Sequence, residues 1–397
     1  MHWYQLDGVE VPTDPAVTQL STPFATVDAG RIEHNVGVMH EVLRGAGAVL
    51  APHGKTTMAP SLWRRQLDAG AWAITVATPA QARVAAAHRV PRILHAGAVV
   101  VPADIRSLGA LAVGGAEVIV WCDDPKSVEL LASHYPSDAP ALGVLVDRGT
   151  AGARTGARTV GTALRTAEAV RACDRLTLHG VAAWEGSLRT ANGPATGDDV
   201  AAFCREVVET FTAIESAGLF EVPRPVISAG GSQFPDVVAA SFAGLRERAL
   251  VVLRSGCYLT HDDGMYHRSS PFDADRRTPG LLPAVHVWGS VVSRPEPGLV
   301  LVNVGKRDIG SDEPPRATQL RRDGRVTEFP GDGIARPLND QHAHLQVIED
   351  ADVRLGDLVR FGISHPCLTF DKWRTLQVID DCGAPVPAVI GGIQTWF

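Results

Sequence analysis

The feature that most constrains the fold is an eightfold alternation of short apolar runs with segments of helical length. The apolar runs lie at residues 49–51, 72–77, 93–96, 117–121, 142–146, 176–183, 225–228 and 249–253. Helical patterns lie between them, for example at 60–69, 79–88, 102–111, 125–134 and 198–217. Such alternation predicts a parallel sheet covered by helices. An open doubly wound sheet would show the same pattern, but eight repeats favour a (β/α)8 barrel.

The sequence pattern and composition change on either side of this repeat. From Asp28 to Arg44 apolar residues recur at helical spacing, and Asp28 can cap the helix. After about residue 265, Pro and charged residues become frequent, and β-like runs lie at 285–292, 299–304 and 358–363. Residues 266–397 therefore read as a mostly β domain, in which the charged, Gly- and Pro-rich residues 305–333 form a long loop.

Composition limits the class of protein. With 397 residues, 45% of them hydrophobic, the chain can bury a large core and form two domains. The net charge of -7 provides no basic patch for nucleic acid, so we expect a small-molecule partner. Six cysteines without a Cys-x-x-Cys pair argue against a disulfide framework. We expect a cytoplasmic protein, because neither a signal peptide nor an apolar run of membrane-spanning length is visible.

Lys55 is the first candidate for a catalytic residue. Val49 and Leu50 look like the end of a buried strand, which Pro52 and Gly54 would stop. Active sites of α/β barrels lie at the carboxyl ends of strands, where desolvation lowers the pKa of an amine and makes it a nucleophile toward an aldehyde. A solvated surface lysine is the alternative, and on this segment alone it would be the more common outcome.

Two loops are candidates for a phosphate site. The seventh apolar run ends in residues 228–232, Ser-Ala-Gly-Gly-Ser, and the eighth in residues 254–258, Arg-Ser-Gly-Cys-Tyr. Barrel enzymes often bind phosphate at the loops after strands seven and eight, where glycines let backbone amides approach the anion. Ordinary Gly-rich turns are the alternative, but glycines and hydroxyls at both loops favour the phosphate interpretation.

A candidate metal pair lies near the end of the chain. His365 and Cys367 flank Pro366, and in an extended backbone residues i and i+2 point to the same side. Imidazole and thiolate together suit zinc. The cluster His261, Asp262, Asp263 and His267 is a rival on composition, although a polar loop is the simpler interpretation there.

These segments together resemble a known family. Residues 52–56, Pro-His-Gly-Lys-Thr, the upstream Thr22-Pro23-Phe24 and the segments near residues 147, 180, 230, 256 and 365 are similar to the D-threonine aldolase and D-serine dehydratase family. The resemblance implies an alanine-racemase-like fold, with a barrel binding pyridoxal 5'-phosphate (PLP) at 22–265 and a β domain formed by 1–21 and 266–397. It also implies a homodimer. The implied cofactor-binding residues are His53, Lys55, Arg154, Ser228, Gly230, Gly231, Ser232, Gly256 and Tyr258.

The resemblance also implies roles for individual residues. Lys55 would hold PLP and remove the α-proton of a D-amino acid, and Arg154 would lie beside the pyridine ring. His365 and Cys367 would hold Zn²⁺ or another divalent metal. His342 would be a catalytic or outer-shell residue, although His344 could equally serve. Trp184 stands where members more often carry tyrosine, which leaves its role open between wall of the substrate pocket and core filler.

The functional prediction is a PLP- and zinc-dependent lyase for β-hydroxy-D-amino acids, most specifically a D-serine dehydratase that forms an oxo acid and ammonia. The family's dehydratases resemble this chain in having His-x-Cys at the position of residues 365–367, whereas the aldolases typically carry His-x-Asp there. Retro-aldol cleavage to glycine and an aldehyde is the nearest alternative. A racemase or a non-catalytic PLP-binding protein are weaker ones.

Overall fold

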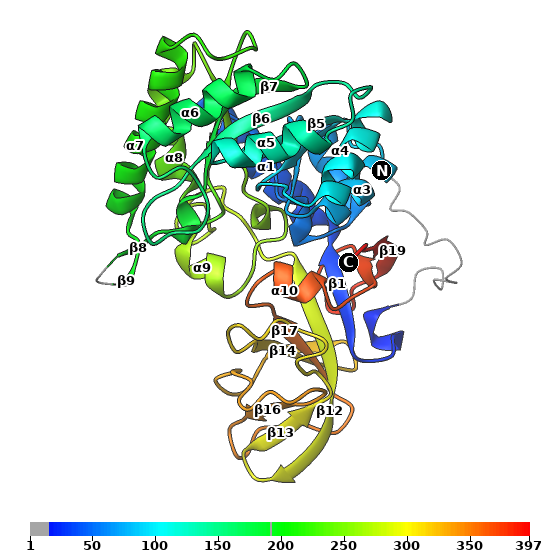
Figure 1. The fold of residues 1–397 in the computed structure, drawn as a ribbon. Coiled ribbons are helices and arrows are strands. Elements are labelled where there is room, and N and C mark those ends of the chain that lie inside the picture. Colours follow the sequence, from blue (N-terminus) through cyan, green and yellow to red (C-terminus); the bar gives the residue numbers. More distant parts are fainter. Residues whose placement is uncertain (1–15, 191–192) are drawn as a thin grey trace. The chain divides into compact units, whose positions relative to one another are not determined.

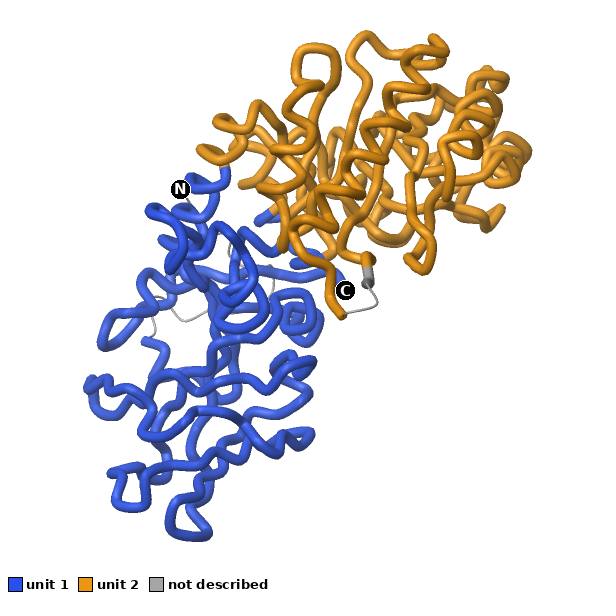
Figure 2. The backbone as a smooth tube through the Cα atoms, turned by 90° about the vertical axis from the view of Figure 1, so that its left-hand side faces the viewer, with its two compact units in different colours: residues 1–39, 56–62, 257–397 blue, residues 40–55, 63–256 orange. Residues whose placement is uncertain are grey.

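A computed structural model describes residues 16–190 and 193–397, and the described elements are labelled in Figure 1. The chain divides into two compact units, shown in Figure 2. Unit 1 comprises the residues up to 39 together with 56–62 and 257–397, and unit 2 comprises 40–55 and 63–256. Of the predicted β-domain segment 1–21, residues 1–15 lie outside the described part.

Unit 2 contains a closed parallel barrel, which confirms the predicted fold class. Its eight strands are hydrogen-bonded in the order β2-β11-β10-β7-β6-β5-β4-β3. The barrel closes between β2 and β3, because the Trp72 amide donates to the Leu50 carbonyl at 2.7 Å. The strands coincide with the eight predicted apolar runs: β2 (Val49–Leu50), β3 (Ile74–Val76), β4 (Arg92–His95), β5 (Glu117–Cys122), β6 (Leu142–Arg148), β7 (Leu176–Ala183), β10 (Val226–Ala229) and β11 (Leu250–Leu253).

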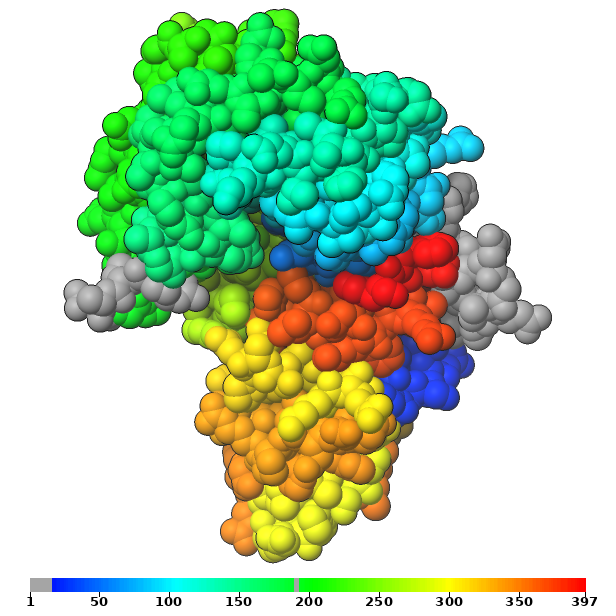
Figure 3. All heavy atoms as spheres, viewed as in Figure 1, coloured from blue at the N-terminus to red at the C-terminus, as the bar shows by residue number. Residues whose placement is uncertain are grey.

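Helices cover the barrel, and their starts follow from the sequence. Proline is tolerated in the first helical turn because the first amides have no intrahelical acceptor, and several of these helices begin at proline. In Figure 3 the segments coloured cyan to green form the visible surface of unit 2. The helices wholly within unit 2 are α3 (Pro79–Ala87), α4 (Pro102–Val113), α5 (Pro125–His134), α6 (Val160–Arg171), α7 (Gly197–Ser216) and α8 (Pro235–Ser241), whereas α1 (Ala29–Ala46) and α2 (Pro60–Asp68) are each divided between the two units. Among the described residues, no helix is long and apolar enough to cross a bilayer.

The barrel interior is filled by apolar side chains from different strands. Small and large side chains together fill it, as in the layered interiors of such barrels. The buried cluster consists of Ala51, Ala73, Leu94, Ile119, Trp121, Leu145, Ala182, Val226 and Val252.

Unit 1 is built on a mostly antiparallel sheet in the order β15-β14-β17-β12-β1-β18-β19, with β13 paired to β12 and β16. Residues 22–28 were predicted in the barrel domain, but β1 pairs with β12 and β18 in this sheet. Its Phe24 ring stacks on Trp288 at 5.9 Å. The strands are β1 (Phe24–Asp28), β12 (Val285–Glu296), β13 (Leu299–Val302), β14 (Arg316–Arg322), β15 (Arg325–Glu328), β16 (Ala343–Gln346), β17 (Leu358–Gly362), β18 (Thr375–Ile379) and β19 (Val389–Gln394).

The predicted loop at 305–333 is wrong in part, because it contains the hairpin β14–β15. Asp323 and Gly324 form its turn with positive φ angles of 48° and 74°. An Asp-Gly pair in this conformation matches the twist of two antiparallel strands and is a strong hairpin signal. The abundance of charge, Gly and Pro hid two short strands. Three short helices follow residue 256: the 3-10 helix η5 (Cys257–Leu259), α9 (Met265–Ser269) and α10 (Cys367–Phe370).

Candidate active site

Lys55 lies on the short helix η2 (Gly54–Thr56), directly downstream of the barrel strand β2. The preceding Pro52 carbonyl accepts a hydrogen bond from the Thr75 amide at 2.8 Å, which fixes this segment to β3. The Lys55 side chain is exposed, so burial does not supply the desolvation that we expected from the sequence. The position at the carboxyl end of a strand nevertheless suits a reactive amine.

Three basic groups lie close enough to His53 to lower its pKa. Burial and the positive charges of Lys55, Arg254 and Arg154 hold the pKa of His53 well below its usual value of 6.5. Its Nδ1 atom is buried and has no hydrogen-bond partner within the described part of the chain. A neutral imidazole, an amine and two guanidinium groups therefore lie close together, which is a favourable environment for an anionic ligand with a polar group that pairs with His53.

Arg254 is buried at the end of β11. Its guanidinium lies 4.8 Å above the Trp121 ring and donates to Ser228 Oγ and to the Ala183 carbonyl, both at 2.5 Å. Ser228 Oγ in turn donates to the Val252 carbonyl at 3.0 Å. The hydroxyl of Ser228, predicted to bind phosphate, is thus engaged inside the barrel, where it helps to hold Arg254.

The glycine loop after β10 binds a carboxylate that the sequence analysis did not single out. Glu185 accepts the amide of Gly230 at 3.1 Å through Oε2 and that of Gly231 at 2.5 Å through Oε1. These amides, which we predicted for phosphate, therefore converge on an anionic oxygen pair. The signal was the acidic residue after the sixth barrel strand. The other predicted residues here are Ser232, which is half-buried, Gly256, and Tyr258, which is buried on η5 (Cys257–Leu259).

The segment after β6 places Arg154 on an aromatic face. Its guanidinium lies 4.0 Å above the Trp184 ring, so Trp184 contacts a cation through its aromatic face. Nearby, the Thr155 hydroxyl donates to Asp147 at 2.8 Å. Burial raises the pKa of Asp147 to about 6, despite that hydrogen bond.

A second group of reactive side chains lies in unit 1. One potential ligand atom from each of Cys257, His365 and Cys367 lies within 4.8 Å of the others, and the two Sγ atoms are 3.8 Å apart. His365 Nδ1 pairs with Asp312 Oδ2 at 3.0 Å. Such a carboxylate–imidazole contact is typical of metal-binding histidines, whose other ring nitrogen holds the ion. The donor set fits zinc.

The backbone between His365 and Cys367 has a different conformation from the extended one that we predicted. Pro366 has helical angles, φ -60° and ψ -46°, and Cys367 begins α10, so the backbone is not extended. One potential ligand atom of His365 nevertheless lies within 4.8 Å of Cys367 Sγ. The pKa of Cys367 is lowered well below its usual value by a hydrogen bond with Cys257 and by His365.

Within the described part of the chain, the four residues of the rival cluster do not form one metal-binding group; of these four, His267 alone lies in such a group, together with Asp273 and Asp275. Asp262 Oδ1 accepts the amides of Gly264 and Tyr266, both at 2.9 Å, and so caps α9. His261 and His267 instead share Asp273, at 2.7 Å and 3.0 Å. The polar-loop interpretation thus describes this segment.

The predicted catalytic histidine lies just before β16. The His342 side chain is exposed. His344, the alternative, contacts Asn339 Oδ1 through Nε2 at 2.8 Å. In the part of the chain that the structure describes, the group around Cys257 includes neither histidine. A catalytic role for His342 stays a prediction.

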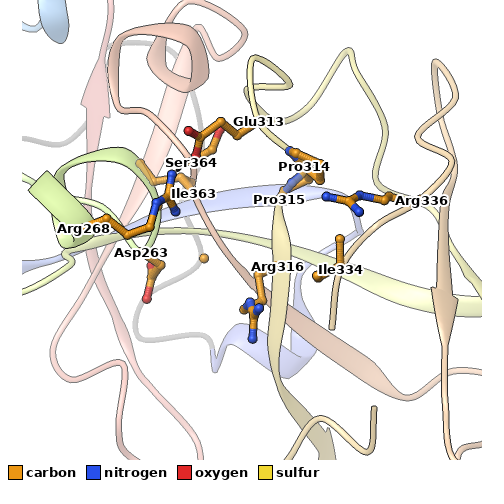
Figure 4. A pocket seen from close by; sticks show the side chains of 12 residues that line it. Asp263, Arg268, Glu313, Pro314, Pro315, Arg316, Ile334, Arg336, Ile363 and Ser364 are labelled. Carbon is orange, nitrogen blue, oxygen red and sulfur yellow. Dashed lines mark hydrogen bonds and ion pairs between the residues drawn. The ribbon is translucent and has the colours of Figure 1, made fainter. Parts of the chain in front are cut away.

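A pocket of about 270 Å³ opens beside the segment that carries His365. Figure 4 shows Arg268 and Arg336 reaching toward it from opposite sides. Arg268 is paired with Glu313, whereas the Arg316 and Arg336 side chains are exposed. With Asp263 also in the lining, the three arginines exceed the two carboxylates by one charge, so the pocket suits an anionic group.

Comparison with known proteins gives concordant matches. Residues 284–379 match the family model described as "Putative serine dehydratase domain". The chain is 26% identical to D-threo-3-hydroxyaspartate dehydratase from Delftia sp. (strain HT23), over 95% of this chain and 97% of that protein. It is 25% identical to 3-hydroxy-D-aspartate aldolase from Paracoccus denitrificans (strain Pd 1222), over 92% and 91%. The crystal structure of D-threonine aldolase from Filomicrobium marinum matches with a TM-score of 0.78 at 21% identity, covering 96% of this chain and 98% of that one. Alanine racemases share the fold as well.

Proposed function

Because the chain belongs to a D-threonine aldolase-like family with the alanine-racemase-like fold, we propose that it is a PLP- and metal-dependent lyase for β-hydroxy-D-amino acids. The favoured reaction is dehydration followed by release of ammonia and an oxo acid, with D-serine as the first substrate to test. A cysteine-to-alanine mutant of D-threo-3-hydroxyaspartate dehydratase has been solved in a metal-free form, which implies that this relative binds a metal and supports the same for this chain.

The observation that carries this proposal is the position of the thiol–imidazole cluster in the chain. Thr56 follows Lys55 in the sequence, and its hydroxyl lies 3.5 Å from Cys367 Sγ. Cys257 follows Gly256 at the end of the second predicted phosphate loop. The residue after Lys55 thus contacts the cluster, and the residue after Gly256 belongs to it. A lyase that removes a β-hydroxyl needs PLP to acidify the α-carbon and a metal to activate the hydroxyl of the same substrate.

Each group has a definite task in this reaction. PLP, when bound, supplies the electron sink that acidifies the α-carbon. Lys55 would hold the cofactor, and its amine would accept the α-proton. Arg154 and Arg254 bring positive charge to the anionic cofactor, and His53 Nδ1 is available to pair with a polar group on it. A divalent metal, when bound at His365 and Cys367, supplies Lewis acidity toward the β-hydroxyl.

Retro-aldol cleavage to glycine and an aldehyde is the second candidate, favoured by the similarity to the Paracoccus aldolase. The two reactions differ in the bond that breaks. Dehydration breaks the Cβ–O bond and releases ammonia, whereas the aldol route breaks Cα–Cβ and keeps the amine in glycine. The thiolate ligand Cys367 favours dehydration, since the family's aldolases typically carry His-x-Asp instead of His-x-Cys in the matching segment.

The test is a product analysis with protein loaded with PLP and zinc. We expect ammonia and oxo acid from D-serine, D-threonine or 3-hydroxy-D-aspartate but not from L-serine, and loss of activity with a chelator. Lys55→Ala should abolish turnover and cofactor attachment, whereas Lys126→Ala, at an exposed position on α5, should leave both unchanged. Glycine plus aldehyde would assign the protein to the aldolases. No turnover of any D-substrate would overturn the proposal.

A further inference from the structure

We propose that Cys257 is a third protein ligand of the metal, so that this protein holds its ion with one imidazole and two thiolates rather than with the pair His365 and Cys367 alone. The inference rests on the metal dependence proposed above. It assigns a binding role to a cysteine that follows the predicted phosphate loop, which the sequence pattern alone reads as an ordinary core thiol.

The sulfur separation matches zinc coordination. Zinc–sulfur bonds are about 2.3 Å long in tetrahedral sites, which places two thiolates on one ion about 3.8 Å apart. Cys257 Sγ and Cys367 Sγ are 3.8 Å apart, and a ring nitrogen of His365 completes a triangle with all sides within 4.8 Å. One ion can therefore reach all three atoms, and a fourth position stays open for water or a substrate hydroxyl.

Backbone contacts hold the two ligand segments against each other. The amides of Asp263 and Met265, downstream of Cys257, donate to the carbonyls of Ile363 at 3.1 Å and Ser364 at 3.0 Å, just before His365. Gly264 permits this approach, because a Cβ there would lie 2.7 Å from Ser364 Cα. The relative position of Cys257 and His365 is thus set by the fold before any ion binds.

The neighbours of the cluster orient its ligands. Asp312 accepts hydrogen bonds from His365 Nδ1 and from the Ser364 hydroxyl, both at 3.0 Å, so the Nε2 atom of His365 is the ring nitrogen left for a metal. The Thr56 hydroxyl can donate to a Cys367 thiolate. Cys257 is 4% exposed, which shields its sulfur from solvent oxidants.

The third ligand has chemical consequences. Two thiolates neutralise a divalent ion, which strengthens binding and favours zinc over magnesium, since soft sulfur ligands select soft metals. They also reduce the Lewis acidity of the ion toward a substrate hydroxyl. We therefore expect a tightly held metal that resists chelators more than a two-ligand site would.

The direct test counts sulfur atoms around the metal by X-ray absorption of the zinc-loaded, full-length protein. We expect two sulfurs in the wild type and one in Cys257→Ser. In the cobalt-substituted protein, thiolate-to-cobalt absorption should fall by about half in Cys257→Ser. Zinc affinity of that variant should fall by more than the roughly 10–100-fold typical of losing an outer-shell partner. Cys204→Ser, which replaces a buried thiol on α7, should leave the sulfur count and affinity unchanged.

The outcomes separate this inference from the proposed function. One sulfur in the wild type, with metal-dependent dehydration intact, would overturn the role of Cys257 and leave the lyase standing. Absence of stoichiometric metal would overturn both. The sulfur count in the wild type needs no variant, so it decides the question even if Cys257→Ser does not fold.

Discussion

The glycine before the candidate lysine provides a quantitative test of how Lys55 is positioned. At Gly54 an added Cβ would lie 2.6 Å from Ile74 Cγ2 and 3.0 Å from the ring of Trp63. The indole Nε1 also donates to the Gly54 carbonyl at 3.1 Å, so the ring cannot turn away without losing that hydrogen bond. Gly54→Ala therefore introduces a methyl group where rigid neighbours leave no space.

The expected magnitude follows from overpacking. Inserting a methyl group into a filled site typically costs about 1–3 kcal/mol. For a unit of this size, 1 kcal/mol shifts the melting temperature by about 2–4 °C, so Gly54→Ala should lower the Tm of unit 2 by roughly 2–12 °C. It should also displace Lys55 and reduce the visible absorbance of lysine-bound PLP.

The matched control is the same substitution on a helix of the same unit. Gly161 lies on α6, and a Cβ there would meet only Arg165 Nη1 at 3.7 Å and Thr159 Oγ1 at 3.9 Å. Gly161→Ala should stabilise by up to about 1 kcal/mol, because alanine loses less backbone entropy in a helix. Melting curves by circular dichroism, with and without PLP, compare the two variants. An unchanged or raised Tm for Gly54→Ala would refute the steric argument.

Two further predictions concern single carboxylates. Asp312→Asn should weaken zinc binding about 10–100-fold in a chelator competition, because the His365 ring loses its carboxylate partner. Glu313→Gln, which removes the partner of Arg268 instead, should leave zinc binding unchanged. Equal losses in the two variants would count against a role of Asp312 in orienting His365. Burial raises the pKa of Asp147 from 3.8 to about 6, so this group favours the folded state most below about pH 4, and that contribution disappears as the pH rises through 6. Asp147→Asn should therefore flatten the fall in the free energy of unfolding between pH 4 and 6 by roughly 2–3 kcal/mol, whereas the exposed Asp138→Asn should not. An unchanged pH profile of unfolding in Asp147→Asn would show that another group titrates there.

Local patterns were sufficient for much of the architecture. Each barrel strand is a continuous apolar run because both of its faces are buried, and each starting proline or capping residue acts within one turn of its helix. The position of Lys55 after β2 follows from the same local reading, because the end of a strand fixes where the next residues emerge. The hairpin turn at Asp323 and Gly324 was also visible in the sequence, but the polar composition around it concealed the strands.

Contacts between residues that are distant in the chain could not be predicted from local sequence patterns. Cys257 and Cys367 are 110 positions apart, and only the folded β unit brings their sulfur atoms together. Glu185 and Gly231 are likewise 46 positions apart, and their hydrogen bond exists because two barrel strands end at the same face. Strand β1 precedes the first barrel strand in the chain, yet hydrogen bonds from β12 and β18 place it in the other sheet.

The sequence by itself determined the barrel, the lysine at its carboxyl end and the His-x-Cys pair, because periodicity and short motifs depend on neighbouring residues. Tertiary structure alone decided that the pair gains a second sulfur and that the glycine amides bind a carboxylate. The physical reason is that such contacts depend on long-range packing, whose partners the linear spacing of residues does not identify.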